Sequence, residues 1–343
     1  MFPDEKATIP AAPAGATALS RSSPTATPVR PFSTPLDVSA LLTTPQQPLD
    51  HVLPGLLAGS VGMLAGPGGM GKTMLELQLA VALATGTPAC GGLFAEVMSP
   101  SAPARVVLVT AEEPVPVLQH RLRAIVHASL TAHERFGITL DFASFVERLD
   151  ANLQLFASAP HAYTLLDRGL QPTSVLDDLT EACVGARLVF LDPLRQFHDG
   201  EENDSAAMNR LVQTLRQLAM ATGAAVVFAH HTTKASAFAG MGDAAAAARG
   251  SSALTDGVRW QINLSRLSPE QAKVVSVPEA APGHLLLLDV AKSNYLAPYP
   301  TQVLERLPGG VLARCDTASP QPGATKTRGQ SRPGQAKRTG GKP

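Results

Sequence analysis

One eight-residue stretch constrains what this chain can fold into more than any other feature of the sequence. It is rich in glycine, ends in a lysine and a threonine, and consists of Gly66, Pro67, Gly68, Gly69, Met70, Gly71, Lys72 and Thr73. An apolar run over residues 61–65 precedes it, and residues 73–85 follow with the pattern of an amphipathic helix. A strand that turns into a helix through a loop of this composition is typical of a phosphate-binding loop.

Each part of this loop has a physical task in binding a triphosphate. Glycines let the backbone turn inward, so that several N–H groups can face the phosphates. The helix that follows directs the positive end of its dipole at the same anion. Lys72 would place a positive charge between the β- and γ-phosphates, and the hydroxyl of Thr73 would ligate Mg²⁺. We therefore predict that the loop, together with Met74, binds ATP with Mg²⁺.

An aspartate at the end of an apolar run is the candidate partner of Thr73 at the metal ion. Residues 187–191 are mostly apolar and lead directly into Asp192. At the carboxyl end of a parallel strand, this carboxylate would lie beside the nucleotide and hold Mg²⁺ through water. The alternative is that Asp192 only caps the turn after its strand.

Two glutamates follow another predicted strand, over residues 105–110. Glu112 is closer to the strand end, and we predict that it polarises the water that attacks the γ-phosphate, because a general base needs an acceptor within hydrogen-bond reach. Glu113 precedes a proline and could cap the next helix. Both acids could instead be first-turn residues that the helix dipole favours.

A third predicted strand, over residues 225–229, ends in His230 and His231. A polar side chain at this position could contact the γ-phosphate and change position after hydrolysis, and His231 is our candidate for that role. Adjacent residues of a strand point to opposite faces, so the two histidines are not expected to share a metal ion. A histidine here could also be an ordinary surface residue.

The alternation of short apolar runs with helical stretches predicts the fold class. Helices are expected over residues 115–128, 174–184 and 206–221, the last with Asp204 before its start and Gly223 after its end. Strands that alternate with helices indicate an α/β fold, with a mostly parallel twisted sheet covered by helices on both faces. Residues 258–264, 285–290 and 303–314 predict late strands, the last of these ranges a hairpin around Pro308, Gly309 and Gly310.

Composition suggests a folded middle and two tails. Residues 1–48 contain many prolines, which fit neither long helices nor central strands, and we interpret most of this segment as disordered. Residues 49–316 would form the folded domain, and residues 317–343 a basic tail without acids. The 28 basic and 28 acidic residues cancel, so any basic surface must be local. Three scattered cysteines and the lack of a long apolar run favour a cytoplasmic protein.

Several segments in order resemble the RecA-like P-loop ATPases, and among them the hexameric replicative DNA helicases of the RepA type from broad-host-range plasmids. The resemblance covers roughly residues 49–299, and its most distinctive segments are TAEEPVPVLQHRL, LVFLDPLRQFHDGEEN, VVFAHHTTKASA, ARGSSALTDGVRW and AKSNYLAPY. It implies an ATP hydrolase, a hexameric helicase of DNA replication that moves on single-stranded DNA. Lys72, Thr73, Glu112, Asp192 and His231 would take the roles given above.

The resemblance also implies roles for two arginines. Arg121, in QHRL, would lie near the nucleotide, and Arg259, in VRW, would reach the site of a neighbouring subunit as an arginine finger. Such a finger is worth roughly 10³–10⁵ in rate. DnaB-type helicases carry an arginine two residues after a late lysine, whereas Lys292 is followed by Asn294 here. Either Arg259 or the region of Lys292 could therefore supply the finger.

Candidate contacts to single-stranded DNA lie in two segments. Lys234 and Arg249 belong to an Ala- and Gly-rich stretch, and Arg195 follows Asp192. These side chains could hold phosphates in the channel of a ring. Two other functions stay open on the sequence alone. One is a RecA- or RadA-like recombinase, and the other is a regulatory ATPase without a nucleic-acid substrate.

Overall fold

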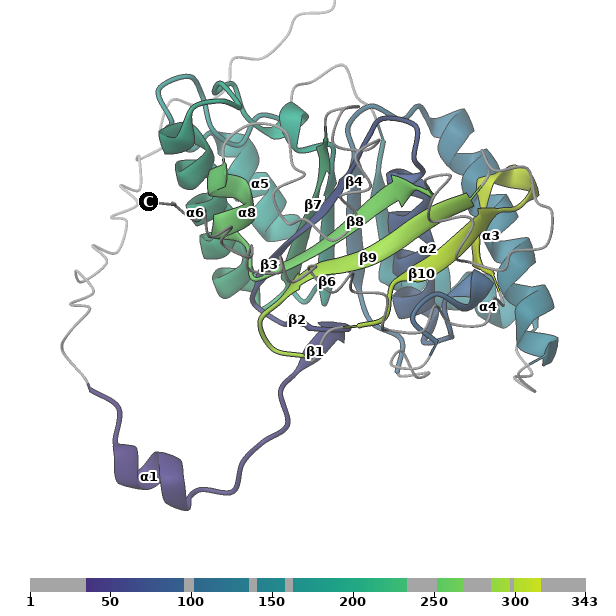
Figure 1. The fold of residues 1–343 in the computed structure, drawn as a ribbon, viewed down its shortest axis with the longest axis horizontal. Helices are drawn as coiled ribbons and strands as arrows, with labels where there is room; N and C mark the ends of the chain where they lie inside the picture. Colours follow the sequence, from purple (N-terminus) through teal and green to yellow (C-terminus); the bar gives the residue numbers. More distant parts are fainter. Residues whose placement is uncertain are drawn as a thin grey trace, which may run out of the picture. The chain divides into compact units, whose positions relative to one another are not determined.

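The computed structural model describes residues 35–95, 102–135, 141–157, 163–232, 252–267, 285–296 and 299–315 (Figure 1). The chain divides into two units, Met1–Pro48 and Leu49–Pro343. The described part of the first unit holds one short helix, α1 (Val38–Thr43), which begins at Asp37. The Asp37 side chain accepts a hydrogen bond from the Ala40 amide, and the helix buries none of its residues.

The second unit is built on a sheet of nine strands in the order β11-β10-β9-β8-β3-β7-β6-β4-β5. Six adjacent strands are parallel: β3 (Val61–Gly66), β4 (Val106–Thr110), β5 (Leu153–Phe156), β6 (Leu188–Asp192), β7 (Ala225–His231) and β8 (Trp260–Arg266). Figure 1 shows them running side by side through the middle of the domain. The predicted parallel α/β sheet is thereby confirmed.

Antiparallel strands complete one side of the sheet. β9 (Leu285–Ser293), β10 (Gln302–Arg306) and β11 (Leu312–Arg314) pair in succession beyond β8. β10 and β11 form the predicted hairpin, with a short 3-10 turn, η6 (Pro308–Gly310), between them. A separate two-stranded sheet, β1 (His51–Leu53) with β2 (Leu56–Leu57), precedes β3.

Helices cover both faces of the large sheet, as predicted (Figure 1). One face carries α2 (Lys72–Thr85), α3 (Val115–Arg135) and α4 (Phe142–Asn152), and the other carries α5 (Ser174–Ala182), α6 (Ser205–Thr222) and α8 (Ser252–Gly257). Short 3-10 turns, η1 (Cys90–Gly92) and η2 (Leu194–Phe197), follow α2 and β6. Among the helices of the described ranges, none has both the length and the apolar character needed to cross a bilayer.

Alternation along β3 divides its side chains between the two cores. Leu64 packs in the core under α2, whereas Met63 and Ala65 pack in the core under α6. Neither row of side chains is exposed, because helices cover the strand on both faces. The sheet therefore fixes where β3 ends and the glycine-rich loop begins.

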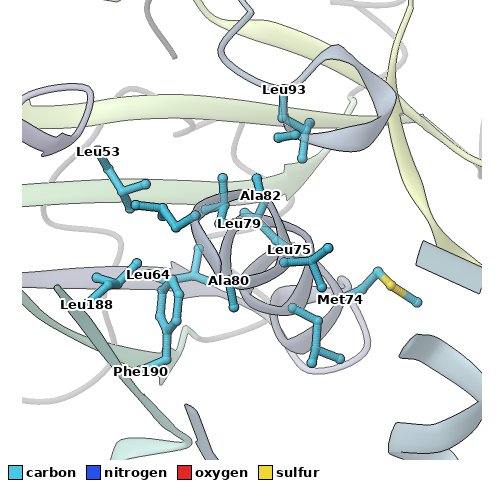
Figure 2. Close-up of a cluster of buried hydrophobic side chains, with 14 of the residues drawn as sticks. Leu53, Leu64, Met74, Leu75, Leu79, Ala80, Ala82, Leu93, Leu188 and Phe190 are labelled. Atoms are coloured by element: carbon cyan, nitrogen blue, oxygen red, sulfur yellow. The ribbon is translucent and has the colours of Figure 1, made fainter. Parts of the chain in front are cut away.

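The helix after the loop is more deeply buried than the sequence pattern indicates. An amphipathic helix was the expectation for residues 73–85, but in α2 every residue except Thr73 is buried. Figure 2 shows why: Leu64, Leu188 and Phe190 of the sheet lie on one side of the helix and Leu93 on another. A helix that is apolar on all sides is a core helix.

Helix α2 also holds the C-terminal hairpin. The buried side chain of Gln78 donates to the Leu312 carbonyl at 2.8 Å and accepts from the Leu312 amide at 2.8 Å, as a neighbouring strand would. The same amide group donates to the Cys90 carbonyl at 3.1 Å. One side chain thus joins the phosphate-loop helix to β11 and η1.

Gln78→Ala should lower the free energy of unfolding by about 2–4 kcal/mol, because it leaves buried backbone groups of Leu312 without partners. Chemical denaturation measures the loss, and amide hydrogen exchange at Leu312 should become faster. Gln213→Ala, at an exposed position of α6, is the matched control and should change stability by less than about 0.5 kcal/mol. Equal effects of the two substitutions would contradict this account of the hairpin.

Candidate nucleotide-binding site

The carboxyl ends of four parallel strands bring the predicted site residues to one edge of the sheet. On neighbouring strands, Gly66 of β3 is level with His231 of β7, and Thr110 of β4 is level with Asp192 of β6. The Ala111 amide donates to the Asp192 carbonyl at 2.8 Å, so the chain leaving β4 stays beside β6. Ligands of open α/β sheets bind at this edge.

The glycine-rich loop folds around the side chain of Lys72. Gly69 and Gly71 have φ values of +74° and +96°, which side chains rarely allow. The Lys72 ammonium donates to the carbonyls of Gly66 at 2.9 Å and Pro67 at 3.2 Å. Burial lowers the pKa of Lys72, which is 5% exposed, and nearby carboxylates oppose this shift.

Thr73 and Asp192 bring two oxygen ligands together. The hydroxyl of Thr73 donates to the Asp192 carboxylate at 2.5 Å, although the two residues come from different elements. Mg²⁺ binds oxygen ligands and is commonly held by one or two protein groups plus phosphates and water. The pair therefore fits the predicted Mg²⁺ site, with Thr73 and Asp192 as the residues that would hold it.

His231 lies against the loop lysine. Its Nδ1 is 3.1 Å from the Lys72 ammonium. Because an ammonium group only donates, Nδ1 accepts, and the proton of the neutral ring is on Nε2. Loss of solvent around the ring, followed by the charge of Lys72, lowers the pKa of His231. The imidazole is therefore neutral at pH 7.

The two glutamates after β4 are in different environments. One oxygen of Glu112 accepts a hydrogen bond from Gln196 at 2.9 Å, and the side chain also lines the cavity described below. Glu113 forms an ion pair with Arg121 at 2.7 Å across the first turns of α3. Of these two acids, Glu112 is thus the one that is not paired with an arginine, as expected of a candidate base.

These groups surround a cavity of about 350 Å³. Its wall joins the loop, α3, the tips of β6 and β7 and the C-terminal hairpin: Gly69, Gly71, Lys72, Thr73, Met74, Glu112, Glu113, Val117, His120, Arg121, Asp192, Pro193, His231, Arg306, Gly309 and Gly310. Most of the predicted nucleotide and catalytic residues thus lie at one cavity. The size suits a nucleotide.

Three residues near the cavity were not predicted from the sequence. Arg306 of the hairpin donates to the Gly69 carbonyl at 3.1 Å, and Gln196 donates to Glu112. Glu76 is fully buried on α2, and burial and then Asp192 raise its pKa well above 4.5. A sequence signal existed for Glu76 alone: it is four residues after Lys72, and therefore on the same helix face.

The predicted finger residues lie at the opposite edge of the sheet. The Arg259 amide donates to the Val61 carbonyl at the start of β3, whereas the glycine-rich loop follows the end of that strand. Lys292 donates to the Thr255 carbonyl at 2.7 Å, and burial and then Arg259 lower its pKa. The structure therefore does not bring Arg259 or Lys292 to the cavity of their own subunit.

The predicted DNA contacts are only partly described. The Arg195 side chain donates to the His198 carbonyl at 2.9 Å and is exposed. Lys234 and Arg249 lie outside the described residues. Their proposed role in binding DNA stays a prediction.

A parallel sheet, a phosphate loop and acids at adjacent strand tips define a RecA-like P-loop ATPase. A family model described as "AAA domain" matches residues 25–237, more than half of the chain, and the protein belongs to that family. A solved structure of the ATPase domain of a helicase is similar with 14% identity and a TM-score of 0.47, over 74% of this chain and 84% of that one. A likeness at this level carries no conclusion about activity.

Glu76→Gln should flatten the dependence of stability on pH. Burial raises the pKa of Glu76 in the folded state above 4.5, so folding takes up a proton, and stability falls as pH rises from about 5 toward the folded-state pKa. The loss is up to about 1.4 kcal/mol per pH unit, and glutamine has no such loss.

The measurement is denaturant unfolding of the full chain from acidic to mildly alkaline pH, with EDTA and without nucleotide. The advantage of the glutamine variant should grow as pH rises. Glu147→Gln, at an exposed position of α4, is the control and should follow the parent curve. Parallel curves for Glu76→Gln and the parent would show that the buried carboxyl does not control the slope.

Proposed function

We propose that this protein is the motor subunit of an ATP-dependent DNA helicase of replication, a ring of six copies that hydrolyses ATP between subunits and moves on single-stranded DNA. The observation that carries the proposal is the separation of two charged sites on one domain. The phosphate loop lies at the carboxyl edge of the parallel strands, and Arg259 with Lys292 lies at the amino edge.

Two arginines already line the cavity, but both are held by other groups. Arg121 is paired with Glu113, and Arg306 donates to the Gly69 carbonyl. Arg259 is exposed and can meet the cavity of a second copy in a head-to-tail arrangement. Such heterologous contacts close into rings when the rotation between copies allows it.

The groups at the cavity fit the hydrolysis of ATP. Lys72 and the loop amides would bind the β- and γ-phosphates, and Mg²⁺ held by Thr73 and Asp192 would neutralise part of their charge. The carboxylate of Glu112 would accept a proton from water while the water oxygen forms a bond to the γ-phosphorus and the bond to ADP breaks. His231, at the tip of β7, would contact the released phosphate.

Movement of the strand tips would reach DNA through the segments that follow them. His231 precedes the segment with Lys234 and Arg249, and Asp192 precedes Arg195. Basic side chains that hold phosphates give binding without sequence preference and a strong dependence on salt. Recombinase and regulatory ATPase are the competing outcomes of the experiments below.

Mixing two inactive variants tests the shared site. Arg259→Ala and Lys72→Ala should each lose nearly all ATPase activity, by roughly 10³-fold or more for the arginine. An equal mixture should recover activity, because one copy supplies an intact Lys72 and its neighbour an intact Arg259. Random mixing would make roughly a quarter of the interfaces complete. The measurement is steady-state phosphate release with single-stranded DNA.

Arg266→Ala is the control, because this exposed arginine lies at the other end of β8. It should keep the parent's activity. Failure of the mixture to recover, with both variants folded and oligomeric, would rule out a residue shared between copies. In the parent, unwinding of a forked duplex separates a helicase from a recombinase, and an ATPase rate that DNA leaves unchanged would favour a regulatory protein.

A further inference from the structure

A glutamine four residues after Asp192 contacts the proposed catalytic base. The side-chain amide of Gln196, in η2, donates to Oε1 of Glu112 at 2.9 Å. Within the described residues, Gln196 is the one side chain that donates a hydrogen bond to Glu112. The contact joins the segments that follow β6 and β4, which are neighbouring strands of the sheet.

Both partners stand on backbone that is held in place. On the glutamine side, Leu194 and Phe197 are buried on either side of Gln196, and the Phe197 carbonyl accepts from the Leu165 amide at 2.8 Å. On the glutamate side, the Ala111 amide is bonded to the Asp192 carbonyl. A bond between two fixed backbones restricts the side chains between them, so it can set the direction of the carboxylate.

The two oxygens of Glu112 therefore differ. Oε1 is engaged by Gln196, which does not line the cavity, whereas the Glu112 side chain itself does. Lys72 and His231 on the opposite wall are close enough to Glu112 for its charge to affect both. A carboxylate with one oxygen held outside the cavity presents the other oxygen to it, as a base that must accept a proton in one direction requires.

We propose that Gln196 is a positioning residue for ATP hydrolysis: it holds Oε1 of Glu112 so that Oε2 faces the attacking water. The inference rests on the proposed function in one respect, the role of Glu112 as the base. Gln196 itself touches neither the nucleotide nor the water. Its contribution is to the turnover step and not to the binding of ATP.

Three substitutions in the full chain separate this role from others. Gln196→Ala removes the donor, and kcat should fall about 10-fold or more, a part of the roughly 10²–10⁴ that a general base contributes. Gln196→Glu keeps the size but opposes a carboxylate to Glu112, and should lose at least as much. Gln196→Arg restores a donor and should keep most of the turnover. Phosphate release at saturating Mg–ATP, with and without single-stranded DNA, gives kcat and KM.

Substrate binding is the readout that a merely structural role would move. KM for ATP and the affinity for Mg–ADP by calorimetry should stay within about twofold of the parent in all three variants. Gln213→Ala, at an exposed position of α6, is the matched control and should match the parent throughout. A kcat within about twofold of the parent for Gln196→Ala would overturn the proposal, and so would equal losses in kcat and in nucleotide affinity.

Glu112→Gln in the same assay keeps the two levels of inference apart. Loss of turnover in Glu112→Gln with normal turnover in Gln196→Ala would remove only the role of Gln196. Normal turnover in Glu112→Gln would instead remove the base from the proposed function. Loss in both, with recovery in Gln196→Arg, is the result expected.

Discussion

The buried ammonium group of Lys72 is the interaction on which the site depends. Removing a charge from water is costly unless other groups compensate. Here the loop carbonyls of Gly66 and Pro67 accept hydrogen bonds from it, and the carboxylates of Asp192, Glu76 and Glu112 offset its charge. The lysine thus gathers the strand tips around one point, and the same charge keeps His231 neutral.

This charge arrangement requires a rigid frame, which the sheet and α2 provide. Because α2 is buried on nearly all sides, neither Lys72 nor Thr73 can move without disturbing both the sheet and the hairpin that Gln78 holds. The hairpin in turn brings Arg306 onto the loop. Strands far apart in the sequence therefore form one wall, and a nucleotide that binds there would contact elements from both ends of the domain.

The sequence was sufficient for features that repeat or that end a strand. Apolar runs located β4, β6 and β7, and the residues at the end of each run located Glu112, Asp192 and His231. Helix α4 and strand β5 were not predicted, because their half-exposed pattern is weak. Gln196 and Arg306 could not be found either, since their partners lie 84 and 237 residues away and only the fold brings them together.

The position of Arg259 shows how one chain can carry a site that it does not complete. β3 and β8 are parallel neighbours, so the start of β8 lies beside the start of β3, at the far edge from the loop. Rotating a side chain cannot overcome a separation set by the length of a strand. An arginine there can act on ATP only when a second copy presents its cavity, and hydrolysis then depends on assembly. That dependence is what a ring motor needs, because each subunit's cleavage step becomes tied to the position of its neighbour.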